Sequence, residues 1–95
     1  MSGLDIVHDA NERRFAARTE HGTARLEYEL VNEDTLDLAH TFVPEEDRGR
    51  GIAARMVEYA FTYASDHGLS VIPTCPYVRS WLKKNPGFES VAVEG

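Results

Sequence analysis

The stretch Arg48-Gly49-Arg50-Gly51-Ile52-Ala53 decides how the rest of the chain is arranged. It follows an apolar run over 36–43 that predicts a strand. After it, apolar residues recur every three or four positions as far as Ala64, which is the pattern of one helix face. Gly68 supplies the helix stop, because glycine adopts the left-handed cap conformation without a Cβ penalty. The sequence therefore predicts a strand, a glycine-rich turn and a long helix, in that order.

A glycine-rich turn that opens a helix is suited to binding an anion. The first backbone N–H groups of a helix lack partners, and the helix dipole places partial positive charge beside them. Glycines let a ligand approach the backbone closely, and Arg48 and Arg50 add positive charge. The pattern favours a diphosphate, and the alternative is a tight surface loop with two solvated arginines. The spacing matches neither the Gly-Lys-Ser/Thr phosphate loop nor the Gly-x-Gly-x-x-Gly fingerprint.

Composition limits the classes of protein to consider. The 95 residues predict a single domain, 1–95, with one core. One cysteine, Cys75, excludes an intrachain disulfide and favours a reducing compartment. No signal peptide is visible, and no apolar run approaches the roughly 20 residues of a membrane span, so we expect a cytoplasmic protein without membrane contact. The net charge of −6 argues against nucleic-acid binding and permits a cationic partner such as an amine.

Alternating apolar and polar residues predict strands on both sides of the glycine turn. The expected strands cover 4–8, 12–19, 23–31, 36–43 and 69–74, with a second helix over 76–84 and a last strand or tail over 88–93. A two-residue turn at His21-Gly22 would pair Phe15 with Tyr28 but set Arg18 opposite Arg25. We predict an α/β fold in which a mixed sheet of four antiparallel strands is followed by helix, strand and helix. The first strands are too close together for a helix between them, so one sheet face stays uncovered and polar.

Two side chains are candidates for chemistry. Cys75 ends the strand after the long helix, at the sheet edge where ligands gather in parallel α/β sheets. A helix that begins at Pro76 would favour the thiolate, and the alternative is a small buried hydrophobic residue. By simple alternation His40 shares the helix-covered face with Leu38 and Phe42, as a hydrogen-bonded core residue, unless a β-bulge redirects it to act as a base. No residues have metal-ligand spacing, so we expect no metal.

These residues resemble the GCN5-related N-acetyltransferase superfamily. Arg48, Gly51 and Ala53 occupy the defined positions of its Q/R-x-x-G-x-G/A loop. More narrowly, His40-Thr41-Phe42-Val43-Pro44 and Pro73-Thr74-Cys75-Pro76-Tyr77 are similar to segments of the small, single-domain YjdJ-like subgroup. The similarity extends from about His40 to Phe88, and the preceding hairpins are compatible with it.

The resemblance implies a minimal fold of this superfamily that binds acetyl-coenzyme A. The cofactor-binding residues that it implies are Phe42, Val43, Arg48, Gly49, Arg50, Gly51, Ile52, Ala53 and Ala54. The diphosphate would lie on the amides of 50–54, and the pantetheine arm would pair with Phe42 and Val43 as an added strand does. The thioester would lie near Cys75, with His40 as general base. The helices that usually shape the acceptor site are missing, so the open sheet face is the expected acceptor side.

Three functions are compatible with these features. The first is acetyl transfer from acetyl-coenzyme A to an amine on a small molecule or protein, either directly or through Cys75. The second is a non-catalytic module that binds or senses coenzyme A or acyl-coenzyme A. The third is an interaction domain with a redox-sensitive thiol. In each case we expect a monomer or weak dimer.

Overall fold

The computed structural model describes residues 4–94. Its elements are β1 (Ile6–Asp9), β2 (Arg14–Thr19), β3 (Gly22–Asn32), β4 (Thr35–Phe42), α1 (Ile52–Asp66), β5 (Ser70–Ile72) and α2 (Pro76–Lys84), with short 3-10 turns at Glu45–Asp47 and Pro86–Phe88. This order confirms the predicted α/β fold. Within the described residues, neither helix has the length and apolarity needed to cross a membrane.

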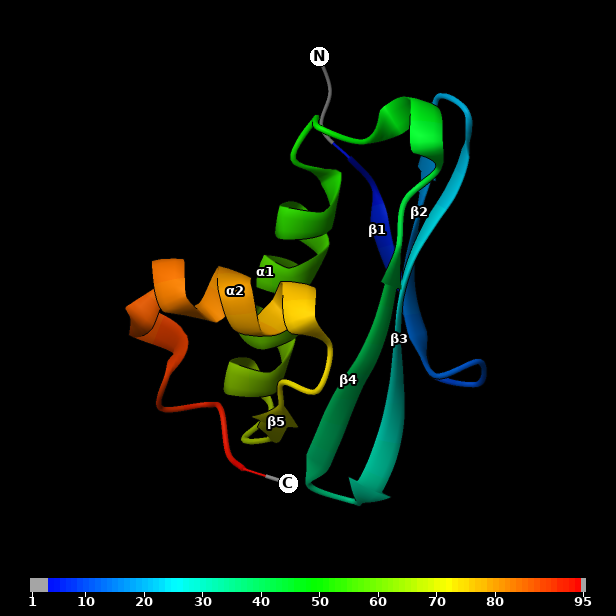
Figure 1. The fold of residues 1–95 in the computed structure, drawn as a ribbon. Helices are drawn as coiled ribbons and strands as arrows, with labels where there is room; N and C mark the ends of the chain where they lie inside the picture. The colour runs from blue at the N-terminus through cyan, green and yellow to red at the C-terminus, as the bar shows by residue number, and fades with distance from the viewer. Residues whose placement is uncertain (1–3, 95) are drawn as a thin grey trace.

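The five strands form one sheet in their sequence order, β1-β2-β3-β4-β5. The first four are antiparallel, and β5 lies parallel to β4 after the crossover through α1. Both helices lie on the same side of this sheet, and no helix of residues 4–94 lies on the other side (Figure 1). The tail over 88–93 is not a regular strand, because its pairing with β5 consists of one parallel bridge between Val71 and Ala92.

The core lies between α1 and the helix-covered face of the sheet. The helix buries most of the predicted face, namely Met56, Val57, Ala60, Phe61 and Ala64. The first two residues of that face, Ile52 and Ala53, are only partly buried. The strands contribute alternate side chains, and α2 closes one end with its own buried face. This one-sided packing fixes the glycine turn, which joins β4 to α1, at the end of the sheet.

The register between β2 and β3 differs from the predicted one. Phe15, expected opposite Tyr28, pairs two residues earlier in β3. A shift of two residues keeps every side chain on its predicted face. It also places Arg18 opposite Thr23 instead of Arg25. The observed register therefore avoids two like charges directly opposite each other, which would destabilise the sheet.

A β-bulge at Ala39 corrects the prediction for the second half of β4. Leu38 and His40 pair with adjacent residues of β3, so Ala39 is the extra residue. The bulge reverses the alternation beyond it. His40 and Phe42, expected on the helix-covered face with Leu38, lie on the open face instead, and Thr41 takes the covered side. Simple alternation was wrong here because it assumes an uninterrupted strand.

His8 joins an aromatic group between β1 and the C-terminal half of α1. Its ring stacks on Phe15 with centroids 4.5 Å apart and meets Tyr63 edge-on at 4.5 Å. Its Nε2 lies 2.7 Å from the Tyr28 hydroxyl. Burial lowers the pKa of His8 below its ordinary value of 6.5. The folded protein therefore favours the neutral ring.

We expect this histidine to make stability fall in mild acid. Because its pKa is lower in the folded chain than in the unfolded chain, its contribution is complete above pH 6.5 and decreases as pH falls from there towards the folded-state pKa. Replacing His8 by phenylalanine keeps a stacking ring without a titrating group. Denaturant unfolding between pH 5 and 8 should then show a flatter acid limb for His8→Phe. Parallel curves for the two proteins would contradict this role.

Candidate active site

The turn between β4 and α1 presents an uncapped helix end. Gly49 and Gly51 adopt left-handed conformations, with φ of 83° and 79°. Gly51 is the N-cap of α1 and offers no side-chain cap. The first helical hydrogen bond runs from the Arg55 N–H to the Gly51 carbonyl, at 3.1 Å. The amides of Ile52–Ala54 therefore have no partner within the helix and can bind an anion.

The two arginines of the loop have different partners. The Arg48 Nε donates a hydrogen bond to the Val43 carbonyl at 2.9 Å. The Arg50 Nη1 pairs with a Glu20 carboxylate oxygen at 2.9 Å and lies 3.5 Å from Asp47 Oδ1. Two carboxylates thus offset the charge of Arg50, although both arginines were expected to supply positive charge. Among residues 4–94, Arg48 has no carboxylate partner and is the loop arginine with its charge available.

The pairing between β4 and β5 ends just before the bulge at Ala39. The Cys75 N–H donates to the Leu38 carbonyl at 3.0 Å, which continues the β4–β5 contact beyond the three paired residues. Further on, Thr41 and Val43 direct their backbone groups to this side, towards Cys75 and Arg48 respectively. Phe42, between them, lies opposite β3. An extended ligand could therefore pair with the chain here through the backbone groups of Thr41 and Val43 that Cys75 and Arg48 leave free.

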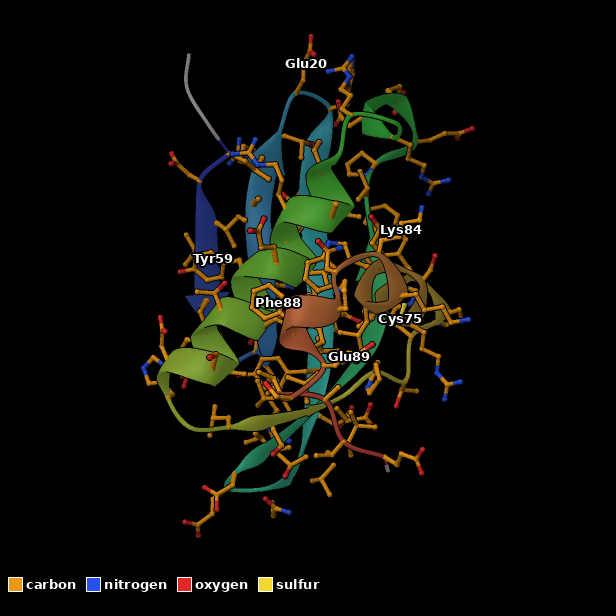
Figure 2. The ribbon with its side chains drawn as sticks, turned by 90° about the vertical axis from the view of Figure 1, so that its left-hand side faces the viewer. Glu20, Tyr59, Cys75, Lys84, Phe88 and Glu89 are labelled. Carbon is orange, nitrogen blue, oxygen red and sulfur yellow. The ribbon has the colours of Figure 1, made fainter. Side chains whose placement is uncertain are left out.

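Cys75 lies at the junction of this edge and α2. It is the N-cap of α2 and is buried, with 7% of its surface exposed. Figure 2 shows it beside the first turn of that helix. Its Sγ is 3.5 Å from the Thr41 hydroxyl. Burial raises the thiol pKa, but hydrogen bonds from the Thr41 side chain and from the amides of Val78, Tyr77 and Thr41 outweigh it, so the pKa is lowered from 9.0. This environment favours the thiolate.

His40 and Cys75 lie on different sides of β4. Cys75 contacts Thr41 on the covered side, whereas His40 is exposed and sits opposite Glu27 on the open face. The expected arrangement, with His40 directly assisting Cys75, is therefore not what the bulge produces. The bulge instead turns the imidazole to the face on which we expected the acceptor.

The geometry agrees with comparisons to known proteins. A family model described as GCN5-related N-acetyl-transferase matches residues 14–91. The chain belongs to the GCN5-related N-acetyltransferase family. Family membership places it among the acyltransferases and confirms the resemblance inferred from the glycine loop. Within the family, acetyl-coenzyme A is the usual cosubstrate.

Relatives in vertebrates match over most of their length. Protein NATD1 of Xenopus tropicalis is 38% identical over 87 residues, which cover 90% of this chain and 80% of the relative. The Danio rerio protein of the same name is 39% identical over 85 residues, with 87% and 77% covered. The solution structure of a GCN5-like protein from Staphylococcus aureus superposes with a TM-score of 0.76 at 24% identity, over 100% of this chain and 93% of that one. This last similarity supports the fold.

Two features of this candidate site and its surroundings were not predicted. Simple alternation along the strand predicts Thr41 on the open face. The bulge instead brings Thr41 to the covered side, where it contacts Cys75. Asp47, at the end of an acidic run, looks like a solvated charge in the sequence, yet it is 1% exposed. Its hydrogen-bond partner His21 lies in the β2–β3 turn, 26 residues away along the chain. No local sequence pattern signals such a contact.

Proposed function

We propose that this member of the N-acetyltransferase family binds acetyl-coenzyme A and transfers the acetyl group to an amine. One observation carries the proposal. Unpartnered amides of Ile52–Ala54 follow a left-handed Gly51, at the end of the strand whose free edge leads to Cys75. This segment thus has a candidate anion site at one end and a polarised thiol at the other.

The residues along this path suggest how coenzyme A would lie. The diphosphate would accept hydrogen bonds from the amides of Arg50 to Ala54, with Arg48 nearby as the available cation. The pantetheine arm would pair with the β4 edge at Thr41 and Val43, next to Phe42. The thioester would then reach the gap between β4 and the start of α2. Gly49 and Gly51 keep the backbone of the loop accessible, because a Cβ at either position would meet no protein atom within 4 Å.

Two routes of transfer are open to Cys75. As a nucleophile, its thiolate would attack the thioester carbonyl and expel coenzyme A as a thiol after proton uptake, and the amine would then attack the acetyl-cysteine and regenerate the thiol. In direct transfer, the amine attacks the thioester and the amides near Cys75 stabilise the oxyanion. In both routes we assign His40 to removing a proton from the acceptor, because it faces the open side.

The open sheet face supports a cationic acceptor. One cross-strand row alternates in charge over Asp9, Arg14 and Glu27 and ends at His40. In the neighbouring cross-strand row, Glu29 of β3 lies directly opposite Asp37 of β4. On the other side of Asp37, the paired residue of β5 is the apolar Ile72. Asp37 Oδ1 is buried without a hydrogen-bond partner. Two opposed carboxylates destabilise a sheet, and a bound ammonium group would offset that repulsion.

We therefore expect amines that carry a second positive charge to be the best acceptors. Coenzyme A release, measured with a panel of acceptors, should be fastest with diamines or lysine-containing peptides. The pair of changes Glu29→Gln and Asp37→Asn should raise KM for these acceptors several-fold. Glu58→Gln, on the helix side, is the matched control and should leave KM unchanged.

Two results would count against this assignment. Activity restricted to anionic or apolar acceptors would contradict the role of the open face. Binding of coenzyme A without release from acetyl-coenzyme A in the presence of any amine would favour the non-catalytic sensor.

A further inference from the structure

Asp47 is a buried carboxylate at the base of the glycine loop. It ends the 3-10 turn Glu45–Asp47 and is 1% exposed. Its Oδ2 accepts a hydrogen bond from the His21 backbone N–H at 3.0 Å, and its Oδ1 lies 2.8 Å from His21 Nδ1. Arg50 Nη1 approaches the same Oδ1 at 3.5 Å. One side chain thus connects the β2–β3 turn with the loop that precedes α1.

The two segments also pack closely against each other beside this side chain. A Cβ at Gly22, the first residue of β3, would lie 3.1 Å from the side-chain Cγ of Pro44, which follows β4 by two residues. Arg50 also pairs with Glu20 across this junction. Figure 2 shows Glu20 at the tip of the turn. The buried Asp47 carboxylate, with both oxygens bound to His21, and the close Gly22–Pro44 contact therefore lie together where the β2–β3 turn meets the glycine loop.

The charges at this junction are matched by protein groups. Glu20, His21 and Asp47 place one potential metal-ligand atom each within 4.8 Å of one another. However, both Asp47 oxygens already face donors of His21, and Arg50 lies between the two carboxylates. The hydrogen bond from His21 holds the pKa of Asp47 at about 2, so the carboxylate stays charged at neutral pH. The cluster is best described as an ion-pair network.

We propose that Asp47 is a positioning residue for the glycine loop, fixing it against the β2–β3 turn so that the amides of Ile52–Ala54 are aimed at one point. This inference rests on the proposed function in so far as the loop is taken to bind coenzyme A. The loop contains two glycines, which leave its backbone free to adopt many conformations. A rigid anchor just before them removes that freedom in advance and lowers the entropy cost of ligand binding.

The test compares Asp47→Asn with wild type by amide relaxation and calorimetry. Asparagine keeps the shape of the side chain but loses its charge. Without ligand, order parameters of 48–54 should fall from the rigid value of about 0.85 towards about 0.6 or below. Coenzyme A should bind about tenfold more weakly, the loss expected for a charged hydrogen bond, while kcat at saturating acetyl-coenzyme A stays close to that of wild type.

Glu45→Gln is the matched control, because it makes the same kind of change at an exposed carboxylate in the same turn. It should behave as wild type. Should Asp47→Asn fail to fold, His21→Ala removes only the side-chain donor and should move both readouts in the same direction by a smaller amount.

Unchanged loop order parameters in a folded variant would overturn the positioning role, even with a lower melting temperature. A wild-type protein that does not bind coenzyme A would instead refute the proposed function. The ligand-free relaxation data would still decide the role of Asp47.

Discussion

Replacing Cys75 by alanine should remove acetyl transfer while leaving coenzyme A affinity nearly unchanged. The thiol lies at the start of α2, where amides of Tyr77 and Val78 and the Thr41 hydroxyl face it. The loop on which we place the diphosphate, 48–54, belongs to a different segment of the chain. If the cysteine carries the acetyl group, kcat should fall by at least about 10³-fold, as for other groups at a reacting centre.

Mass spectrometry distinguishes a cysteine that carries the acetyl group from one that only lines the site. Incubation with acetyl-coenzyme A should add the mass of one acetyl group to the Cys75 peptide of the wild type. His40→Ala should slow turnover by about 10² to 10⁴-fold, the usual contribution of a general base, without preventing the adduct. Full turnover by Cys75→Ala with every acceptor would contradict the covalent route and favour direct attack by the amine.

The second large effect should come from Gly51→Val. At φ of 79° this residue occupies the left-handed region, which costs a branched side chain about 1 to 3 kcal/mol. The added side chain would also project into open space at the loop on which we place the diphosphate. Together with the loss of charged hydrogen bonds, this should weaken coenzyme A binding by about 100-fold or more in calorimetry.

Gly68→Val is the matched control for backbone strain. Gly68 also has a left-handed conformation, with φ of 69°, and no atom lies within 4 Å of its missing Cβ. It is located at the opposite end of α1. The control should lose stability as Gly51→Val does, yet bind coenzyme A like the wild type. Equal affinities for the two variants would contradict the placement of the diphosphate.

Much of the fold follows from local patterns. Alternation predicted the strands, and the three-and-four spacing of Met56, Val57, Ala60 and Phe61 predicted the buried face of α1. The single glycine stop at Gly68 set the end of the helix within about two residues. The strands, the buried helix face and the helix end each depend on residues that are close together in the sequence. Local patterns are therefore sufficient to predict them.

The site depends on contacts that local patterns do not encode. A single extra residue, Ala39, decides whether His40 or Thr41 meets Cys75, and nothing in the alternating pattern marks that bulge. The pairing of Arg50 with Glu20 is equally remote, since it spans 30 residues. Loop glycines indicated where an anion would bind, but the available charge could be assigned to Arg48 only from the structure.

Titration of the labelled wild-type protein with coenzyme A, followed by amide NMR, tests the central claim most directly. The account predicts that the largest shifts occur at Gly51 to Ala54, with a second group at Thr41 and Val43 along the free edge of β4. It would be contradicted by the absence of shifts at millimolar coenzyme A. Shifts confined to the 540 Å³ cavity between α2 and the C-terminal tail, lined in part by Arg79, Lys83 and Glu89, would contradict it equally.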